Sequence, residues 1–463
     1  MSKILRRSML KTLGGISLGS YLPVFGQPSG FDKKNAKSIK TIKTDILVVG
    51  GGTAGVIAAI QAGRAGSSTV LVENGSMLGG TTTTGGVAFP GLFHAWGRQI
   101  IAGIGWELVT EAVKLDGGEL PDFSIPTGRQ HWKHQIILNK NIYALLAEEK
   151  CIDAGVQIRY YETPVACEFN GREWEVDLIG KGTRAKVISK QLIDCTGNAL
   201  ITKMAGFKVL RGEKTQPGSQ MFKMSGYDLD SLDMNLLQKK YSAALEKGVI
   251  KKSEYFGNIR SLLTTGHIST KKTTYINHIA RADSTTSETH TSSNIQGRSA
   301  MIKMLRFIKT LPGCENATIH SMSPEVGIRE TYRIDGLHQI TGEEYITAKV
   351  FDDAIAYSFY PIDIHDENGV DPKHLEEGMV PTISFRALIP KQSRNFLVAG
   401  RCISSDRKAN SALRVQASCM AMGQAAGAAA ALAVKENKTI NEIPVSIIKQ
   451  YIQEHGGIVP NTV

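Results

Sequence analysis

A glycine-rich turn that begins at Gly50 has the residue types and the spacing needed to bind a dinucleotide. The apolar run Ile46–Val49 leads into this turn, small residues with helical character follow it, and Glu73 closes a second apolar run. In such a strand, turn and helix unit, Gly50 allows the tight turn, Gly52 lets the backbone approach a pyrophosphate, and Gly55 lets the helix pack close to the strand. Amide groups at the start of the helix would then face the phosphates.

The acid that follows this turn indicates which nucleotide would bind. Glu73 lies 23 residues after Gly50 and is expected at the tip of the second strand, where a carboxylate accepts hydrogen bonds from ribose hydroxyls. It would repel a 2′-phosphate, which disfavours NADP. A glycine turn alone is often purely structural. Because strand, helix and acid are all in register, the sequence favours nucleotide binding.

Composition and cysteine spacing exclude several other classes of protein. The 463 residues are enough for a large core, and at this length we expect two domains. Part of the formal charge of +11 lies in the first 26 residues, and the other Lys and Arg are scattered among acids, so we expect a solvated surface and no nucleic-acid partner.

The six cysteines form no Cys-x-x-Cys pair, which argues against a dithiol redox enzyme and a zinc site, and no metal is predicted. Cys195 and Cys419 are expected to be buried, inert thiols.

Residues 1–26 resemble a twin-arginine export signal. Arg6 and Arg7 precede a mildly apolar segment over 12–25 that is too short to span a bilayer. The alternative is a basic, frayed N-terminus in which two arginines are adjacent by chance. The first interpretation predicts a disordered linker over 27–42 and a periplasmic or secreted protein. The twin-arginine machinery would export it folded, and no stable membrane insertion is expected.

The rest of the chain alternates between two kinds of pattern. Residues 43–210 and 391–440 have the strand, turn and helix pattern of a nucleotide-binding α/β domain, which would therefore be discontinuous. Residues 211–390 are less regular and form a candidate α+β substrate domain. Residues 441–463 are interpreted as a C-terminal helix and tail.

Apolar spacing and glycine breaks predict individual elements within these parts. Helices are expected near 100–115, 132–154, 294–311 and 411–434. Hairpin turns are expected at Asn170-Gly171 and over 180–182.

Three pieces of the sequence together resemble the glutathione-reductase-like FAD fold. They are the opening fingerprint, the strand end Asp194-Cys195-Thr196-Gly197, and Val398-Ala399-Gly400-Arg401 with the Ala- and Gly-rich helix that follows. Within that fold the chain resembles the FAD-dependent oxidoreductase family, most closely at Pro324–Thr331, Tyr360–His365 and Ala399–Gly427. The resemblance covers about residues 43 to 435. It implies an enzyme with FAD as its cofactor and a Rossmann domain assembled from separated segments.

Two positions depart from the family's pattern. Asn198 stands where an acid is expected, and Lys408–Leu413 replaces a more acidic segment. We expect FAD binding to survive both changes and substrate geometry to be affected.

The resemblance implies which residues would hold the cofactor. The expected FAD-binding residues are Gly50, Gly52, Thr53, Ala54, Gly55, Glu73, Asn74, Gly80, Thr81, Thr82, Val165, Thr196, Gly197, Gly400, Arg401, Arg414, Val415 and Gln416. Of these, Val165 would meet the adenine through its backbone. The helix start at Arg414–Gln416 would point its positive end at the pyrimidine edge and stabilise a reduced anionic flavin.

Two histidines are candidates for the catalytic base. Hydride removal from a carbon that bears a hydroxyl needs a base for the hydroxyl proton, and histidine suits that task. His365 and His94 are the candidates, and for each the alternative is a purely structural histidine. His94 could also anchor the flavin covalently.

Charged residues of the middle segment are further candidates. Arg329 and Glu330 are neighbours, so in a strand they face opposite ways, and one could meet substrate while the other joins the scaffold. An internal ion pair with Arg333 or Asp335 is the alternative. Arg386 could bind hydroxyls or a carboxylate, or simply be solvated.

The leading hypothesis is an exported oxidoreductase that transfers a hydride between FAD and a small, polar, hydroxylated, sugar-like substrate, with an unidentified electron acceptor or donor. One alternative is a reductase of an activated double bond in a carboxylate substrate, held by Arg329 or Arg386. Another is a non-catalytic flavin-binding protein. An NAD dehydrogenase would have no use for Thr196-Gly197 and Gly400-Arg401.

Overall fold

The computed structural model describes residues 39–127, 130–251, 258–270, 274–366, 369–370 and 372–461. The predicted export signal over 1–26 and most of the predicted linker over 27–42 lie outside these residues. Residues Ile39–Val463 form one compact unit, and the description below concerns this unit alone.

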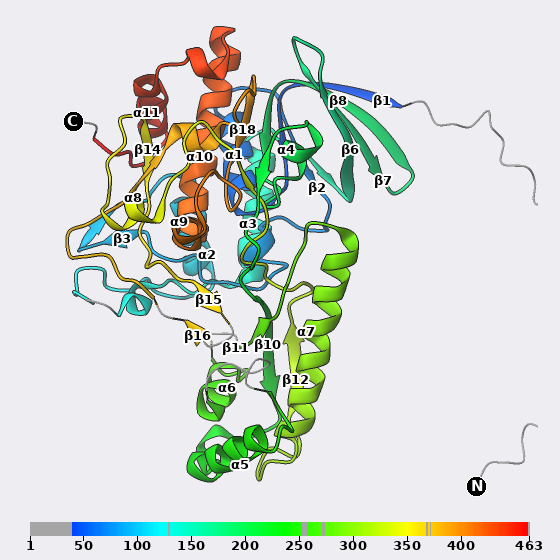
Figure 1. Ribbon diagram of the computed structural model, residues 1–463, viewed down its shortest axis with the longest axis vertical. Coiled ribbons are helices and arrows are strands. Elements are labelled where there is room, and N and C mark those ends of the chain that lie inside the picture. The colour runs from blue at the N-terminus through cyan, green and yellow to red at the C-terminus, as the bar shows by residue number, and fades with distance from the viewer. Residues whose placement is uncertain are drawn as a thin grey trace, which may run out of the picture. The chain divides into compact units, whose positions relative to one another are not determined.

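A parallel sheet forms the centre of the unit (Figure 1). In spatial order it contains β5 (Gln157–Tyr160), β2 (Thr69–Glu73), β1 (Lys40–Val49), β8 (Thr183–Asp194) and β18 (Phe396–Val398). Both faces of this sheet are covered, so strand β1 is a continuous apolar run at its end rather than an alternating one. β18 joins β8 although about 200 residues separate them, which makes the fold a mixed α/β fold built from distant segments.

The first half of β8 belongs to an antiparallel extension of the same sheet. β6 (Glu162–Phe169), β7 (Trp174–Gly180) and β8 pair as two consecutive hairpins. Both predicted turns are confirmed, since Gly171 and Gly182 have φ of 96° and 69°. These values are strained for other residues and natural for glycine.

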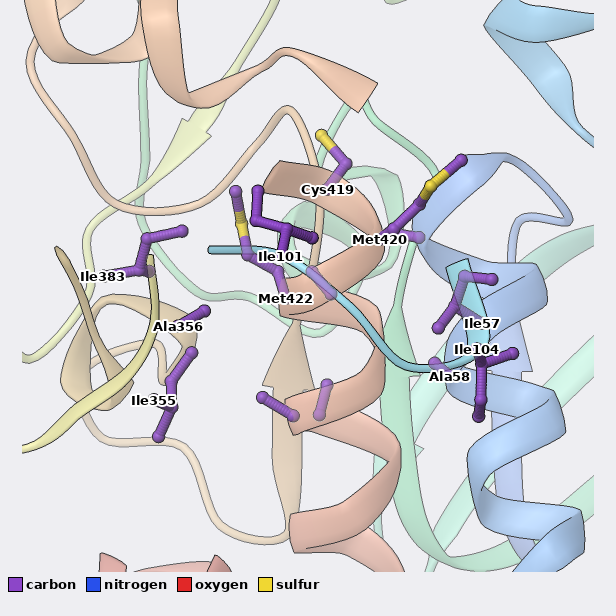
Figure 2. Close-up of a cluster of buried hydrophobic side chains, with 14 of the residues drawn as sticks. Ile57, Ala58, Ile101, Ile104, Ile355, Ala356, Ile383, Cys419, Met420 and Met422 are labelled. Atoms are coloured by element: carbon purple, nitrogen blue, oxygen red, sulfur yellow. The ribbon is translucent and has the colours of Figure 1, made fainter. Parts of the chain in front are cut away.

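Two parallel helices, α1 (Thr53–Arg64) and α10 (Gln416–Glu436), pack closely beside the sheet. A Cβ on Gly423 would lie 2.3 Å from the Ala54 carbonyl oxygen, and one on Gly427 would lie 2.4 Å from that of Ala58. Small residues are therefore required at this contact. In Figure 2, Ile57 and Ala58 lie on one side of α10, and Ile355 and Ile383 lie on the other.

Among the described residues, α10 is long and apolar enough by length and composition to cross a membrane, but 89% of the relevant window is buried inside the unit. We therefore interpret it as a core helix. The predicted helix over 411–434 is in fact two helices, because the chain turns at Arg414 and Val415 between α9 (Arg407–Leu413) and α10.

Other helices differ from the sequence predictions mainly at their starts. α2 (Ile104–Leu115) agrees with the predicted segment, whereas α3 (Lys140–Asp153) begins late because Asn139 caps it. α7 (Ser287–Ile308) begins early at a Thr286 capping box. α11 (Val445–Glu454) is the predicted C-terminal helix.

The middle segment contributes a second, separate core. β10 (Gly218–Ser225) pairs with β11 (Thr274–Ile279) and β12 (Thr318–Met322) in an antiparallel sheet. The helices α5 (Met234–Glu246), α6 (Ile259–Thr265) and α7 pack with it, as Figure 1 shows for α7. Later parts of the same segment, including Ile355 and Ile383, belong to the main core instead. The boundaries proposed for a substrate domain stay a prediction.

Short elements complete the unit. They are β3 (His94–Ala95), β4 (Arg98–Gln99), α4 (Leu200–Met204), β9 (Val209–Leu210), β13 (Arg333–Ile334), α8 (Gly342–Ile346), β14 (Ala354–Tyr357), β15 (His365–Asp366), β16 (Gly369–Val370) and β17 (Thr382–Ser384).

Candidate cofactor and active site

A cleft of about 1570 Å³ lies at the carboxyl ends of the central parallel strands. The residues directly after three of these strands, Gly50, Cys195 and Ala399, line it. Open parallel sheets bind their ligands at this edge. The cleft therefore has the position expected of a nucleotide site.

The start of α1 has the backbone geometry that a pyrophosphate requires. A Cβ on Gly50 would lie 2.5 Å from the Cys195 carbonyl oxygen, and one on Gly55 would lie 1.8 Å from that of Gly50. A Cβ on Gly52 would meet nothing within 4 Å, and Gly52 lines the cleft. No side chain caps the helix at Gly52, so its first amide groups are left for an anion.

Glu73 is held at the cleft by backbone amides. Its Oε2 accepts from Gly51 N at 2.8 Å and its Oε1 accepts from Gly75 N at 2.7 Å. Burial raises the pKa of Glu73, although these two amides oppose the rise. Each oxygen has a second lone pair, so the carboxylate can accept from a ribose while it keeps its backbone bonds.

Most of the predicted FAD-binding residues share this cleft. Those that line it are Gly50, Gly52, Thr53, Ala54, Glu73, Asn74, Gly80, Thr81, Thr196, Gly197, Gly400, Arg401, Arg414, Val415 and Gln416. Three others lie elsewhere. Gly55 is buried behind the glycine turn, Thr82 is buried and donates to Gln416, and Val165 is exposed while its neighbours Thr163 and Pro164 line the cleft.

Arg401 joins separated segments instead of presenting its whole guanidinium to the cleft. It donates from Nε to the Gly197 carbonyl at 2.9 Å, from Nη1 to the Ile328 carbonyl, and from Nη2 to Asn198 Oδ1 at 2.8 Å. Burial lowers its pKa. Asn198 also donates from Nδ2 to the Ser284 carbonyl at 2.8 Å, so this amide has a structural role that a carboxylate could not fill.

The start of α10 forms a second helix end at the cleft. Val415 is its N-cap residue and makes no side-chain capping bond. Gln416 is fixed in place, since Thr82 Oγ1 donates to its Oε1 at 2.7 Å and its Nε2 donates to the Val87 carbonyl at 2.8 Å. The positive end of a 21-residue helix is therefore fixed at the cleft wall.

His365 and Asp363 form a hydrogen-bonded pair in the wall of the cleft. His365 Nε2 lies 3.1 Å from Asp363 Oδ2. The His365 contacts lower the pKa of Asp363 despite its burial, so Asp363 is a carboxylate and Nε2 is the donor. In the neutral ring the basic nitrogen is then Nδ1. Burial is the main reason that the pKa of His365 falls to about 4, which keeps the ring neutral at neutral pH.

Two arginines and a glutamine surround this pair. Arg329 and Arg414 both line the cleft, and the charge of each contributes to the low pKa of His365. Gln216 Oε1 accepts from the His365 backbone N at 3.1 Å and from Arg414 Nη2 at 3.3 Å. Arg329 Nη1 donates to the Pro217 carbonyl at 2.6 Å. The five side chains come from four segments that are distant in sequence.

The structure does not bring the other charged candidates to the cleft. Glu330 is 1% exposed and pairs with Arg333 at 2.9 Å and with Arg407 at 3.2 Å, which agrees with the internal ion pair left open by the sequence. Arg386 pairs with Asp353 at 3.0 Å on the outside of the main core.

His94 also lies outside the cleft lining. Its ring stacks on Phe123 with centroids 3.7 Å apart and contacts Trp106 edge-on. Burial lowers its pKa to about 4, and His134 adds to the effect. This environment matches the structural alternative given for His94.

Sequence reasoning missed the partners of the catalytic candidates. Asp363 was visible only as part of the Tyr360–His365 motif, where its spacing of two residues from His365 was the available signal. Gln216 gave no signal, because it lies about 150 residues from His365. Thr163 and Pro164 line the cleft whereas Val165 does not, and the strand register shifts between Pro164 and Ala166.

The six cysteines are all buried and free. Cys195 and Cys419 line the cleft wall, and burial raises the pKa of both, to about 12 for Cys419. Both are therefore protonated thiols at neutral pH, as the sequence predicted.

Fold and cleft together define a dinucleotide-binding α/β protein with a polar reaction site. Residues 45–452 match the model of the family described as FAD dependent oxidoreductase. This match covers most of the chain, and the chain belongs to that family. It is an FAD-dependent enzyme.

Similarity to individual proteins is more distant. A stretch of 55 residues is 51% identical to dihydrolipoyl dehydrogenase from Pseudomonas aeruginosa, but it spans only 12% of this chain and 12% of that protein. A geranylgeranyl bacteriochlorophyll reductase-like protein from Thermoplasma acidophilum has 12% identity and a TM-score of 0.44, over 89% of this chain and 83% of that one. p-Nitrophenol 4-monooxygenase from Pseudomonas putida has 12% identity and a TM-score of 0.39, over 90% and 85%.

The residues at the cleft fit FAD. Gly52 faces open space beside an uncapped helix start, and Glu73 lines the same cleft at the end of β2. Bound FAD supplies two-electron chemistry. The chain supplies the backbone cradle at α1, the positive end of α10 and a neutral, oriented histidine.

Proposed function

We propose that this enzyme transfers a hydride between FAD and a small, polar, hydroxylated substrate, with His365 as the base that takes the hydroxyl proton. Asp363 orients the ring, and Arg329 and Arg414 line the cleft beside it. Bound FAD would accept the hydrogen of the carbon–hydrogen bond together with its electron pair, as a hydride. The hydroxyl proton passes to Nδ1 of His365, and a carbonyl group forms.

The Asp363–His365 pair is the observation that carries this proposal. A neutral histidine with a carboxylate on one nitrogen is held in one tautomer and one orientation, as a general base must be. It also lies in the same cleft as the uncapped ends of α1 and α10. His94 and Arg386 lack this position.

The finer fold assignment is also a proposal. Three separated segments build the parallel sheet, and an antiparallel three-stranded section enters through β8. These features support a glutathione-reductase-like subtype. The middle segment, with its own core, would then act as the substrate domain.

We further propose export by the twin-arginine route, which rests on Arg6 and Arg7 and the apolar segment that follows. The double variant Arg6→Lys and Arg7→Lys should keep the protein in the cytoplasm, and cell fractionation measures this. Unchanged export of the variant would contradict this route.

The main test is anaerobic reduction of the purified flavoprotein by a panel of hydroxylated compounds, followed as bleaching of the visible spectrum. For a compound that bleaches the wild type, His365→Gln should keep the colour and slow reduction by about 10² to 10⁴-fold. Reduction of the variant at the wild-type rate would remove His365 from this role.

The same reduction rate should depend on pH in a defined direction. Because the pKa of His365 in the free enzyme is about 4, the base is neutral above that value. The second-order rate constant for reduction at low substrate concentration reports the free enzyme, so it should fall only as pH drops through about 4. An ordinary exposed histidine would lose its basic form near its usual pKa of about 6.5. The His365→Gln profile should lack this step.

A second candidate is reduction of an activated double bond in a carboxylate substrate, which the position of Arg329 at the cleft favours. Turnover with an artificial electron acceptor supports the first function. Turnover only with reduced viologen supports the second.

A further inference from the structure

His365, the proposed general base, lies close to the positive charges of two arginines. Burial is the largest cause of its low pKa, and the charges of Arg329 and Arg414 add to it, while Asp363 opposes it. Positive charge beside a base weakens it in the free enzyme. Guanidinium groups donate hydrogen bonds to any hydroxyl, but an anionic group also gains charge attraction from them. Two arginines beside the base therefore favour an anionic substrate over a neutral polyol.

Two buried donors at this position have no acceptor among the residues that the structure describes. They are Nε of Arg414 and Nε2 of Gln216. Both groups belong to the network that holds His365, since Gln216 Oε1 accepts from both His365 N and Arg414 Nη2. Buried donors in native proteins normally have partners, so an acceptor-rich group is expected here.

We propose that the substrate is a hydroxy acid, whose carboxylate lies against Arg329 and Arg414 while its hydroxyl lies at His365. This inference rests on the proposed function and names its substrate class. Guanidinium groups recognise carboxylates through charge-assisted hydrogen bonds. In the reaction the carbinol C–H bond breaks with hydride passing to FAD, the hydroxyl proton passes to His365, and the product is an oxo acid.

The bound carboxylate has a second effect on catalysis. Its negative charge offsets the two arginines, so the pKa of His365 rises when substrate binds. The base becomes stronger only in the complex. Arg329 and Arg414 thus select an anionic substrate and couple its binding to the strength of the base.

The binding test uses 2-hydroxyisobutyrate, which has a hydroxyl and a carboxylate but no hydrogen on the carbinol carbon and so cannot be oxidised there. tert-Butanol is its neutral counterpart. Titration calorimetry on the FAD-loaded enzyme should detect 2-hydroxyisobutyrate and not tert-butanol. Arg329→Gln should weaken the affinity by about tenfold or more, whereas Arg172→Gln, at an exposed turn, should not.

Proton linkage provides a readout that a merely structural arginine would not change. At about pH 5.5, repetition of the titration in buffers of different ionisation enthalpy should show net proton uptake by the wild type, because the bound anion raises the pKa of His365. His365→Gln should bind the anion without this uptake. Binding of tert-butanol with equal affinity, no binding of either compound, or unchanged affinity in Arg329→Gln would each overturn the inference.

Failure of this inference and failure of the proposed function give different results. If glycerol and glucose bleach the flavin through His365 while glycerate and gluconate do not, the function stands and the hydroxy-acid inference is wrong. If 2-hydroxyisobutyrate binds through Arg329 but no hydroxylated compound reduces the flavin, the anion site stands and the proposed hydride transfer is wrong.

Discussion

One end of the cleft is built mainly from backbone atoms, and the other is built mainly from side chains. Around the start of α1 the site consists of backbone, with glycines at positions where a Cβ would collide or would fill the cleft. Around His365 it consists of side chains from four distant segments, joined by hydrogen bonds through Gln216 and Asp363. The first end follows from local spacing, whereas the second exists only after the chain has folded.

The largest expected effect separates two glycines of the backbone end. Gly55→Ala places a Cβ 1.8 Å from the Gly50 carbonyl oxygen, so it should lower the free energy of unfolding by about 3 kcal/mol or more. Gly52→Ala meets nothing within 4 Å and should leave the stability of the apoprotein unchanged while it weakens FAD binding. Urea unfolding and FAD titration measure the two effects.

Two results would contradict the assignment of Gly55 to helix packing and of Gly52 to FAD binding. If Gly52→Ala unfolded the apoprotein, or if it bound FAD as tightly as the wild type, the open space at Gly52 would have another purpose. Gly66→Ala provides no suitable control because its φ is 81°. Ala65→Gly, at the other end of α1, is a suitable one.

A smaller effect, on FAD affinity, is expected at Glu73, whose side chain accepts hydrogen bonds from backbone amides at the α1 end of the cleft. Glu73→Ala removes the acceptor for both Gly51 N and Gly75 N, together with the expected ribose contact. FAD affinity should fall by about tenfold, since each lost bond contributes about 1 kcal/mol. Glu73→Gln keeps one acceptor oxygen, so its FAD affinity in reconstitution assays should lie between those of the wild type and Glu73→Ala. Equal retention of FAD by all three proteins would exclude a cofactor role for Glu73.

The smallest effect concerns His94, whose aromatic cluster lies outside both ends of the cleft. The pKa of His94 is about 4 in the folded protein, against about 6.5 for an ordinary histidine, so the unfolded chain binds more protons between these values. The free energy of unfolding should therefore fall as pH drops from about 6.5 to about 4. His365 contributes in the same direction.

His94→Phe should reduce this pH dependence without changing flavin reduction. The replacement keeps the stack on Phe123, so unfolding at about pH 7.5 should change by less than about 1.5 kcal/mol. Urea unfolding at about pH 5 and 7.5 measures the difference, with His455→Gln as the control histidine. Slower flavin reduction in His94→Phe would instead return His94 to the list of catalytic candidates.

Sequence reasoning predicted the backbone end well and the side-chain end only in part. Gly50, Gly52 and Glu73 could be placed because glycine positions and one acid follow the period of strand, turn and helix. Thr163 and Pro164 line the cleft and Val165 does not, and the strand irregularity between Pro164 and Ala166 cannot be read from composition. Arg386 could not be distinguished from Arg329 in sequence, because its partner Asp353 lies about 30 residues away. For Glu330 the sequence offered the nearby Arg333 as a partner but could not decide between an ion pair and a substrate contact.

Element boundaries show the same limit. The hairpin turn at Gly171 was predictable because positive φ favours glycine. The break between α9 and α10 was not, since Ser411–Arg414 has no proline or glycine to end a helix. That break is what places Val415 at the cleft.

The close contact between α1 and α10 fixes more than the core. Gly423 lies level with Ala54 at the start of α1, whereas α10 already begins at Gln416, so its positive end projects about 10 Å further along the shared axis. A ligand that contacts both helix starts must therefore carry electron-rich groups that are offset by about this distance along the axis. Substitutions buried between these helices should therefore alter the flavin reduction potential without touching the flavin.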